Sequence, residues 1–489
     1  MKSRIMKTMS MPAISRVLRV VTGLSLGCLL VPCLSLAANH YIRTGATGNG
    51  SGSDWTNAYT DLPSSLVRGD TYYFAAGNYI PNGHVFNDSG TAVITLKTAT
   101  VADHGTDVGW SDSYAGQVVF GGGAYAPGIL DFRAGGYVIN GVYRSGWESG
   151  YGMRIALPPM SAIPNGAALR DVWIEGLTGT NIANITIEYL DMPGYGHGVN
   201  QSFYQYGFYA MGWDPGQGGS FSNITIDHCY VHDLGAYATT MLTGQINNFL
   251  IQYSEVARNT SVPDFHSEGI SDRGSSNVTI RYNRYVDIQG TGFIVMNNAG
   301  TPQYCNNWQI YGNVMWEKDY GTYLVGMGAV ACINYNHCTN YYIYNNSIIN
   351  VGWNQNQGGI DFYEAATDSS NINVENNIWY NSINVAPVQP YQGGTPISSD
   401  YNFYIQSTGV PTESHMQTGS SSIFKDSANG DFHLTTETND GLHLSSPYNI
   451  DPDGVQRGSD NNIWSRGAYQ FAPNSSSLNP PSNLTVSVH

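Results

Sequence analysis

Short runs of alternating hydrophobic and polar residues recur along most of the chain. Each run follows an asparagine in the pattern Asn-x-x-(Ile/Val), and successive asparagines are 25 to 39 residues apart. These repeat asparagines are Asn184, Asn223, Asn248, Asn277, Asn307, Asn340 and Asn371. Alternation with a period of two predicts β-strands with one buried face. A repeat of this length predicts that the strands belong to one stacked architecture.

A second repeated position lies six residues after each repeat asparagine. It holds Cys229, Ser254, Asn283, Asn313, Asn346 and Asn377. Four successive asparagines are expected if each turn lies directly above the previous one, because their amides can then hydrogen-bond along the stack and tolerate the left-handed backbone of a bend.

Together the two repeated positions predict an all-β fold, a parallel β-helix or solenoid. Each coil consists of a strand, a bend, a second strand, a variable loop, a third strand and a short return. An antiparallel sandwich would also show alternation. A propeller would need four strands in about 40–45 residues per blade with a blade signature, which the chain lacks.

The two ends of this repeat region resemble a known family, the secreted pectate-lyase-like right-handed parallel β-helix proteins. The resemblance is carried at the start by residues 41–43, 55–66, 68–70 and 72–74, and at the finish by 399–402, 430–434, 451–454 and 467–469. It implies a right-handed β-helix over residues 38–472. It also implies a capping helix before the first coil and a sugar-binding groove along the third strands.

Composition and charge narrow the function. Residues 1–37 combine five basic residues with an apolar run and a Ser-Leu-Ala end, which predicts a cleaved signal peptide and export. The remainder holds 15 Lys and Arg against 36 Asp and Glu, a net charge of −21. Such a charge disfavours nucleic acid and anionic membranes. We expect no membrane insertion and a monomer. Residues 473–489 form a Pro/Ser-rich linker or the truncated start of a further module.

Four cysteines follow the signal peptide. Cys305 and Cys338 each lie two residues before a repeat asparagine on consecutive coils. Stacked strands are about 4.7–4.9 Å apart, which a disulfide tolerates, and export supplies an oxidising compartment. We therefore predict a Cys305–Cys338 disulfide, with Cys332–Cys338 as the competing pair. Cys229 is expected to be a buried free thiol.

The variable loops and the third strands are the predicted site. The third strands are expected at residues 207–211, 235–238, 269–272, 292–296, 322–325 and 359–363. Titratable groups concentrate in the middle of this series. They are Asp264, His266, Glu268, Asp272 and Arg273, with Asp361 on a later coil. Two earlier histidines, His228 and His232, and Asp233 belong to another coil.

These residues suit two ways of cutting a polysaccharide. Hydrolysis needs two carboxylates across the scissile bond, and Glu268, Asp272 and Asp361 are the candidates. β-Elimination needs a base and a cation or metal on a uronate carboxylate. Arg273 or His266 could serve there, with Asp264, Glu268 and Asp272 around a possible calcium ion. The plain alternative is a solvated loop capped by polar side chains.

Aromatic residues accompany the titratable ones, and their faces can stack on sugar rings. Tyr209, Trp213, Tyr237 and Tyr363 are the candidate substrate-binding residues, although tyrosine is also a common strand residue. The Asp-Asp pair of polygalacturonases and the calcium and arginine motifs of classical pectate lyases are missing. Two functions therefore stay open. One is an extracellular polysaccharide lyase or glycoside hydrolase. The other is a non-catalytic, adhesin-like glycan-binding rod.

Overall fold

The computed structural model describes most of the chain between residues 37 and 472. The described ranges are 37–177, 179–196, 199, 201–211, 218–235, 238–259, 267–288, 290, 292–297, 302–319, 328–351, 359–390, 396–459 and 461–472. The predicted signal peptide (apart from Ala37) and the predicted linker lie outside them, as do four predicted site residues: Trp213, Tyr237, Asp264 and His266. No helix in the described ranges is long and apolar enough to cross a membrane.

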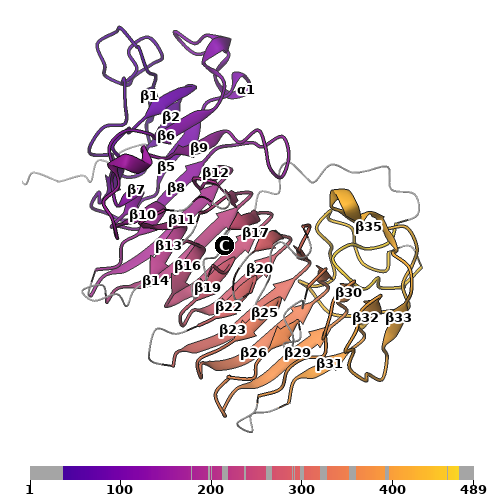
Figure 1. The fold of residues 1–489 in the computed structure, drawn as a ribbon. Coiled ribbons are helices and arrows are strands. Elements are labelled where there is room, and N and C mark those ends of the chain that lie inside the picture. The colour runs from indigo at the N-terminus through magenta and orange to yellow at the C-terminus, as the bar shows by residue number, and fades with distance from the viewer. Residues whose placement is uncertain are drawn as a thin grey trace, which may run out of the picture. The chain divides into compact units, whose positions relative to one another are not determined.

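Three parallel sheets run along the described chain, and from β2 to β32 consecutive strands of the sequence fall into different sheets (Figure 1). Sheet A contains β1 (Asn39–Ile42), β2 (Thr71–Phe74), β5 (Ile94–Thr98), β8 (Tyr137–Asn140), β11 (Asn181–Glu188), β14 (Ser220–Asp227), β17 (Ile246–Gln252), β20 (Ser276–Arg281), β23 (Tyr304–Tyr311), β26 (His337–Tyr344), β29 (Ser370–Glu375) and β31 (Ser398–Asp400). Sheet B contains β3 (Gly77–Tyr79), β6 (Val118–Gly121), β9 (Met153–Ala156), β12 (Leu190–Pro193), β15 (Tyr230–His232), β18 (Glu255–Asn259), β21 (Arg284–Ile288), β24 (Val314–Trp316), β27 (Ser347–Ile349), β30 (Ile378–Tyr380), β32 (Phe403–Ile405) and β33 (Gln417–Gly419).

Sheet C completes each coil. It contains β4 (His84–Phe86), β7 (Gly128–Phe132), β10 (Ala168–Ile174), β13 (Tyr204–Met211), β16 (Ala238–Gly244), β19 (Ile270–Asp272), β22 (Ile294–Met296), β25 (Val330–Cys332) and β28 (Ile360–Asp361). The remaining elements are α1 (Val101–His104), the 3-10 turns η1 (Asp112–Tyr114), η2 (Met160–Ala162) and η3 (Ser427–Asn429), and the antiparallel pair β34 (Phe424–Asp426) and β35 (Asp431–Leu434). The predicted parallel β-helix is confirmed.

A ladder of buried asparagines fixes the stacking of the coils, as predicted. Asn283 Nδ2 donates to Asn313 Oδ1 at 3.1 Å, and the same bond joins Asn313 to Asn346 and Asn346 to Asn377 at 3.0 Å. Asn402 extends the ladder by one more coil. Each acceptor oxygen also takes the backbone N–H of the asparagine before it. Buried amides that satisfy one another in this way specify one register.

The sequence suggested that the ladder asparagines adopt the left-handed backbone of the bend, and this is wrong. The left-handed backbone lies one residue earlier, for example at Tyr282 (φ 59°), Asn345 (φ 53°) and Asn376 (φ 59°). The repeat asparagines are left-handed too, Asn277 at φ 57° and Asn307 at φ 60°. The left-handed residue turns the chain, so the side chain that follows points inward and can bond along the stack.

The third strands differ from the prediction in two coils. Residues 235–238 were expected to form one, but the strand there is β16, Ala238–Gly244. Residues 322–325 lie outside the described ranges, and the strand of that coil is β25, Val330–Cys332. The loops between sheets B and C vary in length. The distance in sequence from a repeat asparagine on sheet A therefore does not predict where the sheet C strand begins.

The predicted capping helix is absent from residues 55–66, which the structure describes as bends and irregular chain with one β-bridge at Tyr59. Trp55 is fully buried there, and its ring lies 4.9 Å from those of Tyr41 and Trp110. Asp54 accepts hydrogen bonds from the backbone and side chain of Asn57. This local turn competes with a helix, and the aromatic cluster holds the segment.

The C-terminal segment covers the outer face of the later sheet B strands. Phe432 packs on Trp316 with ring centroids 5.2 Å apart, and the Ala468 backbone donates to Ser347 Oγ at 3.0 Å. Val314, Ile378 and Phe403 belong to the same apolar cluster. Over the earlier sheet B strands lies the loop before β9, where Tyr151 stacks on Tyr230.

The predicted Cys305–Cys338 disulfide is wrong. Cys338 is bonded to Cys332, the competing pair, and Cys305 is a buried free thiol. Cys305 and Cys338 are indeed register partners on β23 and β26. However, Cys332 is only six residues from Cys338, and closing a short loop costs less entropy than closing one across a whole coil. Cys229 is a buried free thiol, as expected.

Candidate functional site

Asp272, one of the predicted catalytic carboxylates, is the last residue of β19, and its side chain is fully buried. Its Oδ2 accepts hydrogen bonds from Thr243 at 2.7 Å and Ser275 at 2.6 Å, and its Oδ1 accepts the Ser275 backbone N–H at 2.8 Å. Burial raises the pKa of Asp272 despite these bonds. These hydrogen bonds fasten Asp272 to the turn from sheet C to sheet A.

Asp361, a predicted partner of Asp272, lies on a more distant strand of sheet C. Glu268 is fully buried just before β19, and Asp361 is 2% exposed on β28. Three strand steps separate β19 from β28, which is roughly 14 Å at about 4.8 Å per step. Glycosidase carboxyl pairs are about 5 to 9.5 Å apart. The structure therefore does not bring Asp272 and Asp361 together as a hydrolytic pair.

The remaining predicted residues on sheet C face outward. Arg273 Nη1 lies 3.5 Å from Met211 Sδ. Tyr209 is buried, and the Arg170 guanidinium lies over its ring at 4.4 Å. Tyr363 is 48% exposed beyond β28. Of these, Tyr363 alone is placed to meet a ligand directly.

The described part of the predicted calcium site does not fit a calcium ion. Both oxygens of Asp272 already accept hydrogen bonds from hydroxyl or backbone donors, whereas calcium needs six to eight oxygens turned toward it. No group of three or more His, Cys, Asp or Glu suited to a metal occurs among the described residues. Asp264 lies outside the described ranges.

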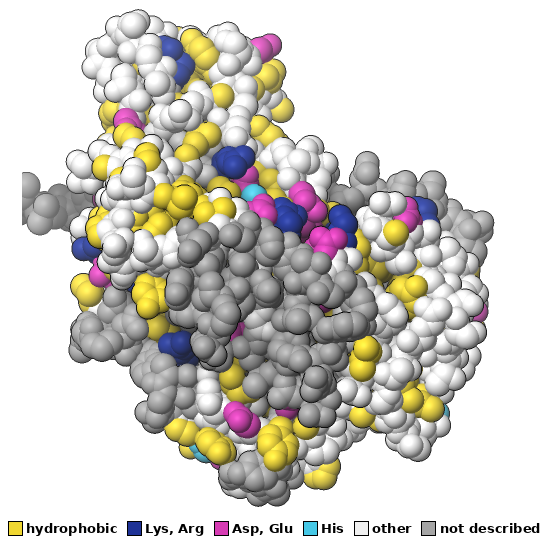
Figure 2. Space-filling model, viewed as in Figure 1, with side chains coloured by type: hydrophobic (Ala, Val, Ile, Leu, Met, Phe, Trp, Pro, Cys, Tyr) yellow, Lys and Arg dark blue, Asp and Glu magenta, His cyan; other side chains and the backbone are white. Residues whose placement is uncertain are grey.

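A different constellation lies on the outer face of sheet B, at the ends of β12, β15 and β18. We call it the Arg258 cluster, and its members are Glu148, Asp191, Tyr230, His232, Asp233 and Arg258. Figure 2 shows acidic, basic and histidine side chains gathered in a band over the region where Figure 1 labels β9 and β12. The register of sheet B places His232 beside Ala257, so that Asp233 and Arg258 follow on neighbouring coils.

Arg258 connects two carboxylates of the cluster. Its Nε and Nη2 donate to the two oxygens of Asp233 at 2.8 and 2.9 Å, a bidentate pair. Its Nη1 donates to Glu148 Oε2 at 3.0 Å, and its Nη2 also donates to the Tyr230 hydroxyl. Glu148 belongs to a loop before β9, and its side chain is 49% exposed.

His232 connects the other side of the cluster. Its Nδ1 lies 2.5 Å from Asp233 Oδ2 and its Nε2 lies 2.8 Å from Asp191 Oδ1. Burial disfavours the imidazolium, but the two carboxylates outweigh it and raise the pKa of His232. Burial likewise disfavours the Asp233 carboxylate, but hydrogen bonds from His232 and Arg258 hold its pKa well below the usual range. Asp233 is therefore ionised at neutral pH, and the two carboxylates favour the protonated form of His232.

The sequence pointed to only part of this cluster. His232 and Asp233 stand out as a His-Asp pair at a strand end, but Glu148 is 110 residues from Arg258. No spacing in the sequence links the two. The repeat asparagines could have shown that positions 233 and 258 are neighbours on successive coils, since they follow Asn223 and Asn248 by ten residues each.

Comparison with known proteins finds similarity in structure only. No family model matches the chain, and no curated protein sequence does. Among solved structures it is similar to pectate lyase Pel9A, with 12% identity, 90% of this chain and 97% of that chain covered, and a TM-score of 0.44. It is also similar to GH136 lacto-N-biosidase from Eubacterium ramulus, with 10% identity, 78% and 68% coverage, and a TM-score of 0.41. The PL6 family alginate lyase AlyGC follows, with 13% identity, 72% and 51% coverage, and a TM-score of 0.23. Likenesses this distant say nothing about substrate or mechanism.

Proposed function

We propose that this chain is an extracellular polysaccharide-active protein that cleaves its polymer as a glycoside hydrolase or a lyase. The observation that carries the proposal is the Arg258 cluster, in which one guanidinium holds two partly exposed carboxylates, Asp233 and Glu148. Export is part of the proposal and rests on the composition of residues 1–37.

For hydrolysis, Asp233 supplies the ionised carboxylate, and Glu148 acts as the proton donor after it has taken up a proton from solvent and released Arg258. Such a pair needs carboxyl groups about 5 to 9.5 Å apart, which two carboxylates on different nitrogens of one guanidinium can satisfy. Asp233 keeps its charge because Arg258 and His232 lower its pKa. Glu148 reaches solvent and can approach a glycosidic oxygen.

For β-elimination, the same cluster offers cations. Arg154 Nε lies 3.5 Å from Asp191 Oδ2 and its side chain is 45% exposed, so it can turn toward a uronate carboxylate. Neutralising that carboxylate acidifies the neighbouring C–H, so that a nearby base can take the proton. Product chemistry separates this route from hydrolysis, because only β-elimination leaves an unsaturated sugar.

The second candidate function is a non-catalytic glycan-binding rod. It is favoured by the way in which the cluster fastens a loop to sheet B: Arg258 binds Glu148, and Tyr151 stacks on Tyr230 with centroids 6.0 Å apart. An ion network can be purely structural, and in that case none of its members turns over substrate.

The test is incubation with a panel of neutral and acidic polysaccharides, with reducing ends and unsaturated-product absorbance read together. We expect one substrate to be cleaved, and Asp233→Asn and Glu148→Gln each to reduce its turnover by at least a hundredfold. Asp431→Asn is the matched control, because Asp431 makes the same 2.5 Å contact with a histidine, His433, in a different part of the fold.

Each outcome of this test decides a different point. If both cluster variants still cleave the substrate and Glu268→Gln does not, the catalytic centre lies beside sheet C and not at the Arg258 cluster. Binding without any cleavage across the panel would favour the rod.

A further inference from the structure

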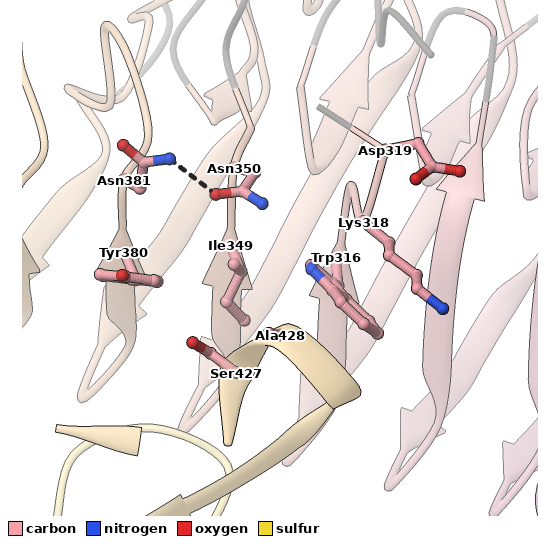
Figure 3. Close-up of a pocket in the computed structure, with 9 residues that line it drawn as sticks. All are labelled: Trp316, Lys318, Asp319, Ile349, Asn350, Tyr380, Asn381, Ser427 and Ala428. Atoms are coloured by element: carbon pink, nitrogen blue, oxygen red, sulfur yellow. Dashed lines mark hydrogen bonds between the residues drawn. The ribbon is translucent and has the colours of Figure 1, made fainter. Parts of the chain in front are cut away.

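A pocket of about 370 Å³ lies on the same sheet B, farther along the stack than the Arg258 cluster. Its floor is a row of three side chains from neighbouring strands, Trp316 on β24, Ile349 on β27 and Tyr380 on β30 (Figure 3). Ser427 and Ala428 of η3 face this row from the opposite side. The pocket is therefore a slot between an aromatic-aliphatic floor and the C-terminal segment.

The polar rim of the slot is held in place by hydrogen bonds. Asn381 Nδ2 donates to Asn350 Oδ1 at 2.8 Å, and Asn350 Nδ2 donates to the Glu317 carbonyl at 2.8 Å. Asp287 Oδ1 accepts the backbone N–H groups of Lys318 and Asp319 at 2.6 and 3.0 Å. These groups are fixed before any ligand arrives, which lowers the entropy cost of binding.

We propose that this pocket binds one neutral pyranose unit of a polysaccharide. Trp316 and Ile349 are 4% and 1% exposed, so the partly exposed ring of Tyr380 is the one that a ligand can meet. An aromatic ring beside amides and a hydroxyl suits a sugar ring, which has apolar C–H faces and polar edges. The volume is near the lower end of the range for ligand pockets, about 300–1,000 Å³. One or two sugar units match it, and a longer stretch of chain does not.

The charges at the rim favour an uncharged sugar. Lys318 and Asp319 are adjacent, so that their charges offset each other at the mouth of the slot. The Lys318 ammonium lies 5.7 Å from the centroid of the Trp316 ring, a cation–π arrangement that engages it with the protein. The polar side chains that remain in the lining are the amides Asn350 and Asn381 and the hydroxyls Ser427 and Tyr380.

The pocket deepens the proposed function and rests on it for the identity of the polymer. Two strand steps separate β18, which carries Arg258, from β24, and four separate it from β30. At about 4.8 Å per step these are roughly 10 and 19 Å. The pocket and the cluster therefore lie on the same sheet within a few strand steps of each other.

The test measures binding of free neutral sugars to the full-length mature protein by saturation-transfer NMR and titration calorimetry. The probes are glucose, galactose, mannose and xylose, with glucuronic and galacturonic acids as the charged comparison. We expect a neutral sugar to bind, and its affinity to fall at least tenfold in Asn381→Gly and in Ala428→Trp. The first variant removes an amide at a left-handed position that glycine tolerates (φ 49°). The second fills the slot from the exposed face of η3.

Asn371→Gly is the matched control. Asn371 is also left-handed (φ 55°) and donates to the asparagine of the previous coil at 2.7 Å, but it lies on sheet A. Unchanged binding in this variant supports the proposal. Binding that persists in Ala428→Trp, a preference for the uronic acids, or no binding by any neutral sugar would overturn it. The binding experiment does not depend on turnover. Loss of sugar binding therefore tests the pocket, and loss of polysaccharide cleavage tests the Arg258 cluster.

Discussion

Arg258 and Asp233 face each other across neighbouring coils and share two parallel hydrogen bonds, 2.8 and 2.9 Å long. The pair lies at the sheet B ends, where both residues have left-handed backbones, φ 53° for Arg258 and φ 55° for Asp233. Asn350, Asn381 and Gln406 are left-handed on later coils. The left-handed conformation at this position thus recurs from coil to coil. The later coils named here carry an uncharged amide at the position where these two coils carry Asp233 and Arg258.

Arg258→Lys should loosen the loop that carries Glu148. Lysine keeps the charge but cannot reproduce the guanidinium fork that holds Asp233, Glu148 and Tyr230 together. We expect hydrogen exchange over residues 143–151 to become about tenfold faster, equivalent to about 1.4 kcal/mol, with no change in the asparagine ladder. Exchange mass spectrometry measures this. Unchanged exchange in that loop would mean that the fork does not hold it.

Asn313→Ala should destabilise the stack strongly. The substitution leaves the backbone and side-chain N–H groups of Asn283 without their acceptor and the Ile280 carbonyl without its donor. At about 1–3 kcal/mol per buried unpaired group, the loss is roughly 3 kcal/mol or more, read as a lower urea midpoint. Asn307→Gly is the control on the exposed face, where it removes one bond to Asn277. A similar loss in both variants would argue against a special role for the buried ladder.

Asp272→Asn should reduce stability and leave catalysis intact. An amide nitrogen in place of one oxygen cannot accept the hydroxyl hydrogens of Thr243 and Ser275. We expect a lower melting temperature but the same turnover per folded molecule on the substrate found in the panel. Loss of turnover at temperatures where the variant is fully folded would return Asp272 to the catalytic residues.

Stability should fall on the alkaline side because of His433. Burial disfavours the charged form of His433, but the hydrogen bonds that its ring donates to Asp453 and Asp431 outweigh burial and raise the pKa of His433 to about 9. The unfolded value is about 6.5, so the stabilisation is complete below about pH 6.5 and disappears as pH rises through 9. Melting temperatures between pH 6 and 10 should therefore decline more in the wild type than in His433→Gln. Parallel curves would contradict the assignment.

The two described free thiols should be unreactive in the folded protein. Burial raises the pKa of Cys229 to about 12 and that of Cys305 well above its usual value. We expect no reaction with a thiol reagent at pH 8 before denaturation, and two reactive thiols per mature chain afterwards. Peptide mapping should recover Cys332 linked to Cys338. A linked peptide that contains Cys305 would show the other pairing.

The sequence alone determined the coil. Alternation predicted that Ile224, Ile226 and Ile280 are buried, and the spacing of the asparagines predicted the stacked bends. Both signals are local and repeat every coil, because each coil packs mainly against its two neighbours. Sequence spacing is therefore enough to predict which residues stack.

Tertiary structure alone decided the candidate site. Alternation ends with the strand, so it could not show that Asp272 turns inward to Thr243 and Ser275. The choice between Cys305 and Cys332 as the partner of Cys338 depended on where a short turn carries each sulfur. Glu148 meets Arg258 only because a loop folds back over sheet B. These contacts arise where the repeat is interrupted, and there no periodic signal is available.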